Sequence, residues 1–143
     1  MNWRVLVSAP YFIPVIEEYR ERLKSEDVEL IAAQVTERLS EAELLDVIGD
    51  IDGIICGDDR ITRRVLDAAP RLKAISKWGT GIDSIDSEAA AQRGIPVYRT
   101  PNAFSEPVAD TVLGYMLTFA RKLPWMDREI RQERWQKPHL VSM

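Results

Sequence analysis

The chain has 143 residues, of which 45% are hydrophobic and 29% charged, and its formal net charge is −4 at pH 7. This composition is typical of a globular protein, and the length suits one domain with at most an appendage. The negative charge argues against nucleic acid as the main partner, and no stretch approaches the roughly 20 apolar residues that would cross a membrane.

The first part of the chain alternates short apolar runs with amphipathic stretches. Continuous apolar runs predict buried strands over residues 3–8 and 28–33. Between them, residues 14–24 carry apolar side chains at spacings of three and four, which predicts a helix. Ser40 and Glu43 match a capping box, in which each residue satisfies a free N–H group of the other, so a further helix is expected to start there.

A third apolar run, over residues 51–56, predicts a strand that ends in Gly57-Asp58-Asp59-Arg60. We expect Asp58 and Asp59 at the rim of a sheet or at a helix start, with Arg60 able to reach an anion. Cys56 is the only cysteine, so no intrachain disulfide is possible, and we expect a core thiol and a cytoplasmic protein. Thr62 fits the cap of a short helix that Pro70 prevents from continuing.

Residues 72–76 predict a fourth strand and residues 95–98 a fifth, with a short helix over residues 88–92 between them. Pro96 cannot donate a ladder hydrogen bond, which favours an edge position for the fifth strand. Strands that alternate with helices and carry continuous apolar runs are typical of a parallel sheet covered on both faces. Ligands of such sheets bind beyond the carboxyl ends of the strands, so the segments after the third and fourth strands are expected to share one rim.

Two glycines one residue apart, Gly79 and Gly81, follow the fourth strand. Glycine accepts positive φ and has no side chain, so a Gly-Thr-Gly turn can present bare backbone N–H groups to a small anion. The spacing alone fits a tight turn without a ligand equally well, because the third glycine of a dinucleotide fingerprint is absent.

A long apolar helix is predicted from Ser105, its expected cap, to about residue 122. Val108, Val112 and Phe119 fall on one side of it, and further apolar residues fall on the adjoining side. Each large apolar side chain left in water forgoes roughly 1.5–3 kcal/mol of burial. We therefore expect a second domain or a second copy of the chain to cover this helix, and the purified chain to self-associate.

Pro124 is predicted to break that helix, and residues 126–135 to form another one that is polar on most sides. Arginines at positions 128, 131 and 134 alternate with acidic residues there, which favours a solvated face with internal ion pairs. No strand or cap follows, so we expect the sequence to be part of a longer protein.

The run from Gly79 to Asp86 resembles the D-isomer-specific 2-hydroxyacid dehydrogenases, most closely the phosphoglycerate dehydrogenase type. The likeness continues through Ala89-Ala90, Gly94-Ile95-Pro96-Val97, Thr100-Pro101-Asn102, Ser105 to Asp110, Arg121, Arg131 and Trp135. The resemblance implies a flavodoxin-like substrate-binding domain over residues 1–101, with a five-stranded parallel sheet in a three-layer α/β/α fold. Residues 102–143 would then be connecting helices that lead into a separate NAD-binding Rossmann domain.

The resemblance also implies roles for particular residues. The backbone of Gly79, Thr80, Gly81 and Ile82 would hold the carboxylate of a small 2-hydroxy or 2-oxo acid, with Lys77 and Trp78 beside it. Thr80 and Val108 would contact the cofactor, NAD or alternatively NADP. Lys77 stands where the family often has an arginine, so it keeps the charge and loses the bidentate fork.

The arginine, glutamate and histidine that carry out catalysis in this family have no counterparts in the sequence, and no Gly-x-Gly-x-x-Gly fingerprint is present. His139 is the only histidine and matches no catalytic position. The sequence therefore offers no catalytic or metal-ligating residue. We expect the chain alone not to transfer hydride, and we expect a homodimer.

Two other functions fit parts of the sequence. A receiver domain has this size and fold, and Asp58 follows the third strand where a phosphoacceptor would lie; against it, the first strand ends in Ser8-Ala9-Pro10, without the carboxylates that hold Mg²⁺. A standalone, non-catalytic domain that binds small anions or dimerises through residues 108–119 is the other alternative.

Overall fold

The computed structural model describes residues 3–135, so His139 lies outside the described residues. The chain divides into two compact units, Met1–Pro101 and Asn102–Met143.

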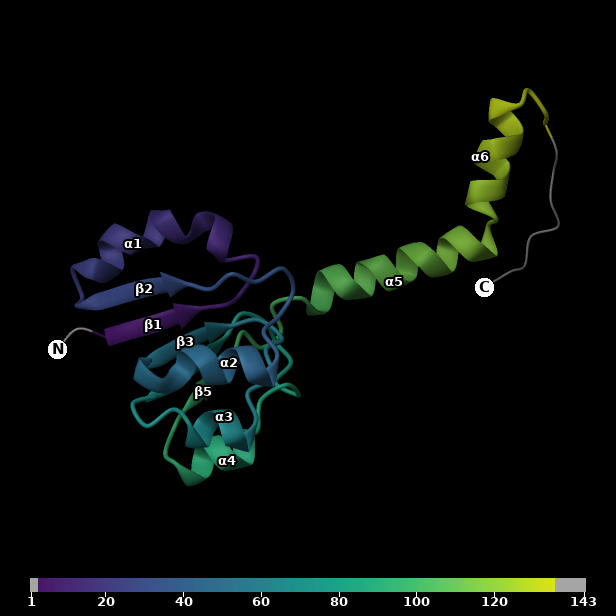
Figure 1. Cartoon of the computed structure of the whole chain (residues 1–143). Helices are drawn as coiled ribbons and strands as arrows, with labels where there is room; N and C mark the ends of the chain where they lie inside the picture. Colours follow the sequence, from purple (N-terminus) through teal and green to yellow (C-terminus); the bar gives the residue numbers. More distant parts are fainter. Residues whose placement is uncertain (1–2, 136–143) are drawn as a thin grey trace. The chain divides into compact units, whose positions relative to one another are not determined.

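The first unit is built on a five-stranded sheet in which every pair of neighbouring strands is parallel (Figure 1). The strands are β1 (Trp3–Val7), β2 (Val28–Ala32), β3 (Gly53–Cys56), β4 (Ala74–Lys77) and β5 (Val97–Tyr98), in the order β2-β1-β3-β4-β5. This is the strand order of flavodoxin-like doubly wound sheets. The predicted α/β fold is therefore confirmed, and β5, which follows Pro96, lies at an edge as expected.

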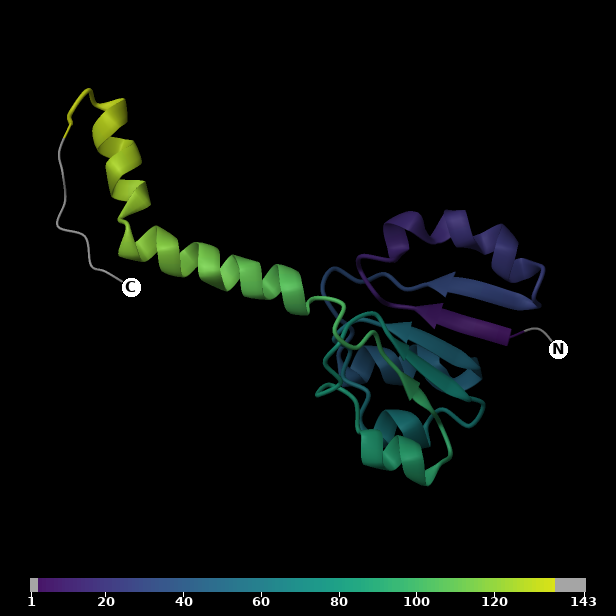
Figure 2. The same ribbon diagram turned by 180° about the vertical axis from the view of Figure 1, so that it is seen from behind.

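Helices cover both faces of this sheet, as Figure 2 shows from behind. One face packs against α2 (Glu41–Val47), the 3-10 turn η2 (Ile48–Asp50), α3 (Arg63–Asp67) and α4 (Ser87–Gln92), which share one core with Leu6, Ile54 and Ile75. The other face packs against the turn η1 (Ile13–Val15) and α1 (Ile16–Lys24), in a smaller core around Val7 and Leu30. Side chains alternate between the faces along each strand, which explains why continuous apolar runs form these strands.

Side chains cap the N-terminal ends of three of these helices. The capping box is present at α2, where the N–H of Ser40 donates to Oε2 of Glu43 over 2.8 Å and the N–H of Glu43 donates to Oγ of Ser40 over 3.3 Å. Thr62 caps α3 as predicted. Asp86 caps α4 by accepting the N–H of Ala89 over 2.8 Å.

The second unit contains α5 (Ser105–Ala120) and α6 (Leu123–Arg131). Two predictions about their ends are wrong. Phe104, not Ser105, is the N-cap of α5, and no side chain caps it. The break comes at Lys122, in the left-handed conformation, and Pro124 lies in the first turn of α6, where its missing N–H is not needed.

The ion pairs predicted for the last helix are present. Arg131 pairs with Asp127 over 2.9 Å, and the Arg134 guanidinium donates hydrogen bonds to both carboxylate oxygens of Glu129, over 2.8 and 2.7 Å. The helix ends at Arg131 rather than at residue 135, because Glu133 takes the left-handed conformation and the N–H of Arg134 bonds back to the carbonyl oxygen of Glu129 over 2.9 Å. No helix within residues 3–135 is long and apolar enough to span a membrane.

Candidate active-site rim

The carboxyl ends of β3 and β4 lie side by side and bring two predicted segments together. Lys77, the last residue of β4, donates from Nζ to the carbonyl oxygen of Gly57 over 2.6 Å and to the carboxylate of Asp58. The N–H of Trp78 donates to the carbonyl oxygen of Cys56 over 2.8 Å. The two segments that follow β3 and β4 therefore form one rim, as expected.

Lys77 is the most enclosed of the predicted site residues. Its side chain is 4% exposed, whereas that of its partner Asp58 is 76% exposed. The ammonium group is thus fixed in the protein and already paired. That it binds substrate stays a prediction, and the sequence contained no local signal for its burial, since Gly57 lies 20 residues earlier.

The loop after Lys77 is supported from the neighbouring strand. Gly79 has φ of +150°, a conformation that side chains disfavour, and its carbonyl oxygen accepts the N–H of Thr100 over 3.0 Å. The Thr80 hydroxyl donates to the carbonyl oxygen of Thr100 over 2.9 Å, and Arg99 donates to the carbonyl oxygen of Thr80 over 3.2 Å. The segment that follows β5 thus holds the loop in place.

Three backbone donors of this loop remain available. Among residues 3–135, no protein acceptor receives the N–H groups of Thr80, Gly81 and Ile82. Successive backbone N–H groups that point to one side carry positive partial charge and suit a small anion. Only Gly79 of the two glycines requires a positive φ.

Trp78 is the first residue of the same loop, and its side chain is exposed. Its ring centroid is 5.0 Å from that of Phe12, which in turn is 5.2 Å from that of Tyr19 on α1. The loop is therefore packed against the segment that follows β1 as well as hydrogen-bonded to the segment that follows β5.

Asp59 differs from the expectation of a rim or helix-start residue because it is fully buried. Its carboxylate accepts the Ser8 hydroxyl over 2.6 Å and the N–H groups of Leu39 and Gly57 over 2.5 and 3.0 Å. These donors follow β1, β2 and β3. Asp59 therefore holds together the segments that follow three strands, and this structural role was missed because every partner except Gly57 is distant in sequence.

Cys56 packs in the core, as predicted. Burial, reinforced by the nearby Asp59 carboxylate, raises the pKa of its thiol to about 12. The thiol is therefore unsuited to nucleophilic chemistry near neutral pH.

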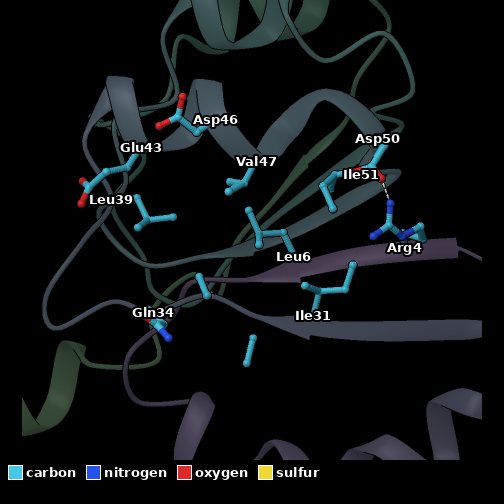
Figure 3. A pocket seen from close by; sticks show the side chains of 12 residues that line it. Arg4, Leu6, Ile31, Gln34, Leu39, Glu43, Asp46, Val47, Asp50 and Ile51 are labelled. Atoms are coloured by element: carbon cyan, nitrogen blue, oxygen red, sulfur yellow. Dashed lines mark ion pairs between the residues drawn. The ribbon is translucent and has the colours of Figure 1, made fainter.

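A cavity of about 560 Å³ lies between α2 and strands β1 and β2, and none of the predicted site residues lines it (Figure 3). Its walls include Leu6 and Ile31 and the carboxylates of Glu43, Asp46 and Asp50, of which Asp50 pairs with Arg4. The excess of negative charge disfavours an acid ligand there. The rim is the better candidate for anion binding.

A family model for the "D-isomer specific 2-hydroxyacid dehydrogenase, catalytic domain" matches residues 5–136. The chain belongs to this family. It is 41% identical over 100 residues to a glyoxylate reductase of Thermofilum pendens, covering 69% of this chain and 30% of that protein. It is 33% identical over 138 residues to a D-3-phosphoglycerate dehydrogenase of Methanocaldococcus jannaschii, covering 94% of this chain and 24% of that protein.

Solved structures of the family share the fold. The NAD+-bound 3-phosphoglycerate dehydrogenase of Entamoeba histolytica superposes with a TM-score of 0.72 at 27% identity, covering 85% of this chain and 40% of that chain. The chain thus spans less than half the length of the relatives that it matches.

Membership of the dehydrogenase family excludes the receiver-domain alternative. Asp58, the phosphoacceptor of that alternative, is paired with Lys77. Within residues 3–135, no group of three His, Cys, Asp or Glu side chains is placed to hold a metal ion. Val108, the second predicted cofactor contact, lies on α5 in the second unit with its side chain exposed, and its role stays a prediction.

Proposed function

We propose that this chain is the substrate-binding portion of a nicotinamide-dependent D-2-hydroxyacid dehydrogenase. In the complete enzyme, hydride would pass between the cofactor and a small 2-hydroxy or 2-oxo acid. The observation that carries the proposal is the loop at the end of β4, where Thr80, Gly81 and Ile82 offer free backbone N–H groups.

These donors suit the carboxylate of the acid. A carboxylate has two oxygens that accept several hydrogen bonds, and bonds from backbone N–H groups to a charged acceptor are stronger than neutral ones. Arg99, which is exposed and bonded to the carbonyl oxygen of Thr80, adds positive charge beside the loop. The names of the relatives, a glyoxylate reductase and phosphoglycerate dehydrogenases, agree with a small acid as the substrate.

The residues present suit only one end of a nicotinamide cofactor. The Thr80 hydroxyl and the open side of the loop are polar and accessible, which fits a contact with the nicotinamide amide. No Gly-x-Gly-x-x-Gly is present to hold the pyrophosphate. We therefore assign residues 1–101 to the substrate-binding domain and residues 102–143 to the helices that connect it to a separate dinucleotide-binding domain, with NAD as the expected cofactor and NADP as the alternative.

We also propose that α5 forms a dimer interface and that the protein works in the cytoplasm. Large apolar side chains along α5 are between 45% and 81% exposed: Val108, Val112, Leu113, Tyr115, Met116, Leu117 and Phe119. A contiguous apolar surface of this kind usually marks an interface. The free thiol of Cys56 suits a reducing compartment.

Titration of the isotope-labelled chain with glyoxylate tests the acid-binding proposal by nuclear magnetic resonance. We expect the amide signals of Thr80, Gly81 and Ile82 to shift with saturation, because their N–H groups would donate to the carboxylate. Glycolaldehyde, which lacks the carboxylate, is the control and should leave them unchanged. Equal shifts with both compounds, or none with glyoxylate, would contradict the proposal.

The same sample separates an enzyme portion from a standalone binder. With glyoxylate and NADH, we expect the chain to bind the acid without oxidising NADH, because no catalytic histidine or dinucleotide fingerprint is available within it. Addition of a separately produced dinucleotide-binding domain from a family relative should restore NADH oxidation for an enzyme portion, and a standalone binder would stay inactive.

A further inference from the structure

We propose that Asp58 determines which acids the rim accepts, because its carboxylate already occupies the anion position on Lys77. The site would then favour small monocarboxylates and disfavour acids that carry a second anionic group, such as a phosphate. This inference rests on the proposed function of the loop over residues 79–82.

The Lys77 ammonium is enclosed in the protein and held by two acceptors. Its side chain is 4% exposed, and Nζ bonds to the Gly57 carbonyl oxygen over 2.6 Å and to the Asp58 carboxylate. A lysine held in this way cannot swing out to meet a ligand, so an anion would have to approach the ammonium at its accessible side. Asp58, whose side chain is 76% exposed, lies on that side.

Asp58 is exposed and is held by Lys77. Among residues 3–135, its carboxylate has no hydrogen-bond partner other than Lys77. Because the ammonium of Lys77 is enclosed, the carboxylate can leave it at small cost only where another anion takes its place. A ligand anion could therefore displace it, but Asp58 would remain nearby as a like charge. The repulsion would weaken binding of the second anionic group.

A monocarboxylate would not meet the repulsion from Asp58. Its one charged group can be held by the N–H groups of Thr80, Gly81 and Ile82, none of which bonds to Asp58. Binding at these donors leaves the Lys77–Asp58 pair intact. The pair would therefore affect only a ligand whose second anionic group extends to Lys77.

A purely structural role of Asp58 makes a different prediction. If Asp58 only anchors Lys77, then Asp58→Asn should preserve ligand selectivity, because the amide oxygen still accepts from the ammonium. If Asp58 acts through its charge, Asp58→Asn should change selectivity and Asp58→Glu should not. Asp46→Asn is the matched control, since it removes one exposed carboxylate from α2 that has no partner among the described residues.

The experiment measures dissociation constants of glyoxylate and of 3-phosphoglycerate for these chains, from the amide shifts of Gly79 and Gly81. For Asp58→Asn we expect the constant for 3-phosphoglycerate to fall by about tenfold, the effect of one removed like charge at short range, while that for glyoxylate changes by less than about threefold. Asp58→Glu and Asp46→Asn should keep the wild-type ratio of the two constants.

Two outcomes would decide against the inference, and a second variant covers a failure of Asp58→Asn to fold. If Asp58→Asn changes both constants in the same proportion, or no more than Asp46→Asn does, Asp58 has no role in selectivity, while the proposed function stands. If Asp58→Asn fails to fold, Asp58→Ser, which also removes the charge, must show the tenfold change. If neither compound shifts the loop in any chain, the proposed function fails together with this inference.

Discussion

Two buried aspartates hold opposite ends of the sheet. Asp59 lies at the carboxyl ends, where it accepts hydrogen bonds from Ser8, Leu39 and Gly57. Asp52 lies at the amino ends and accepts the N–H of Arg4 over 3.1 Å, the guanidinium of Arg71 over 2.7 Å and the ammonium of Lys73 over 3.2 Å. Both side chains organise segments that are distant in sequence.

Asp52 is expected to make the stability of the protein depend on pH in the acid range. The N–H of Arg4, followed by Arg71 and Lys73, lowers the pKa of Asp52 from 3.8 to about 2. Because the folded-state pKa is the lower one, the stabilisation is complete above the unfolded pKa and is lost as pH falls from about 4 to about 2. Asp52→Asn should therefore lower the free energy of unfolding by about 1–3 kcal/mol at neutral pH and by much less near pH 2.

Urea unfolding followed by circular dichroism at several pH values measures this difference. Asp46→Asn is again the control, since that side chain is exposed and should change the free energy of unfolding by less than about 0.5 kcal/mol at any pH. A loss that is equally large at neutral and acid pH would mean that Asp52 acts through its shape and not through its charge.

Sequence patterns could predict the residues that act locally but not those that act through distant partners. The burial of Cys56 followed from its place at the end of an apolar strand. The burial of Lys77 and Asp59 did not, because a lysine and an aspartate are normally exposed unless they are paired, and their partners lie on other strands. Lys77, for example, meets Gly57 across 20 positions of the chain.

At the scale of elements, the strands and most helix starts could be predicted because each has a local cause. Apolar runs form the buried strands, and Ser40 and Thr62 begin helices with their side chains. The errors at Ser105 and Pro124 have one origin: a serine or a proline near a helix start fits more than one position, and the packing of the surrounding chain selects between them.

Ser40 caps a helix with its side chain and Ser105 does not, so substitutions of the two serines should differ in their effect on stability. Ser40→Ala should lower the free energy of unfolding by about 1 kcal/mol, since it removes the hydroxyl that accepts the N–H of Glu43. Ser105→Ala should leave the free energy of unfolding unchanged, because Ser105 is already a residue of α5 and its side chain does not cap the helix. Thermal and urea unfolding of both variants measure this difference. If Ser105→Ala lowers the free energy of unfolding as much as Ser40→Ala does, the assignment of the caps is wrong.

At the scale of the whole molecule, the main open feature is the apolar surface of α5, whose side chains are not buried. No residue of α5 is buried. For a domain whose net stability is about 5–15 kcal/mol, leaving seven large apolar side chains half exposed forgoes a substantial stabilisation. A partner that covers them would recover it.

We expect the purified chain to form dimers at tens of micromolar, by sedimentation velocity, and Val112→Glu to shift it to monomers, because a charge would be buried in the interface. Gly114→Glu adds the same charge about 160° around the helix from Val112, and a Cβ at Gly114 would meet no atom within 4 Å. It should leave the dimer intact. A wild-type chain that sediments as a monomer would refute the interface.

The hydrogen bonds that hold the rim also bear on how tightly a very small ligand can bind. Thr100 donates its N–H to the carbonyl oxygen of Gly79 and accepts the hydroxyl of Thr80, so the loop is hydrogen-bonded to the segment after β5 without a ligand. A two-carbon or three-carbon acid has few atoms from which to gain affinity, and the entropy of ordering a mobile loop would remove much of that gain. Because Thr100 already restricts the loop in the free protein, an acid bound as proposed would keep most of the interaction energy of its carboxylate as affinity.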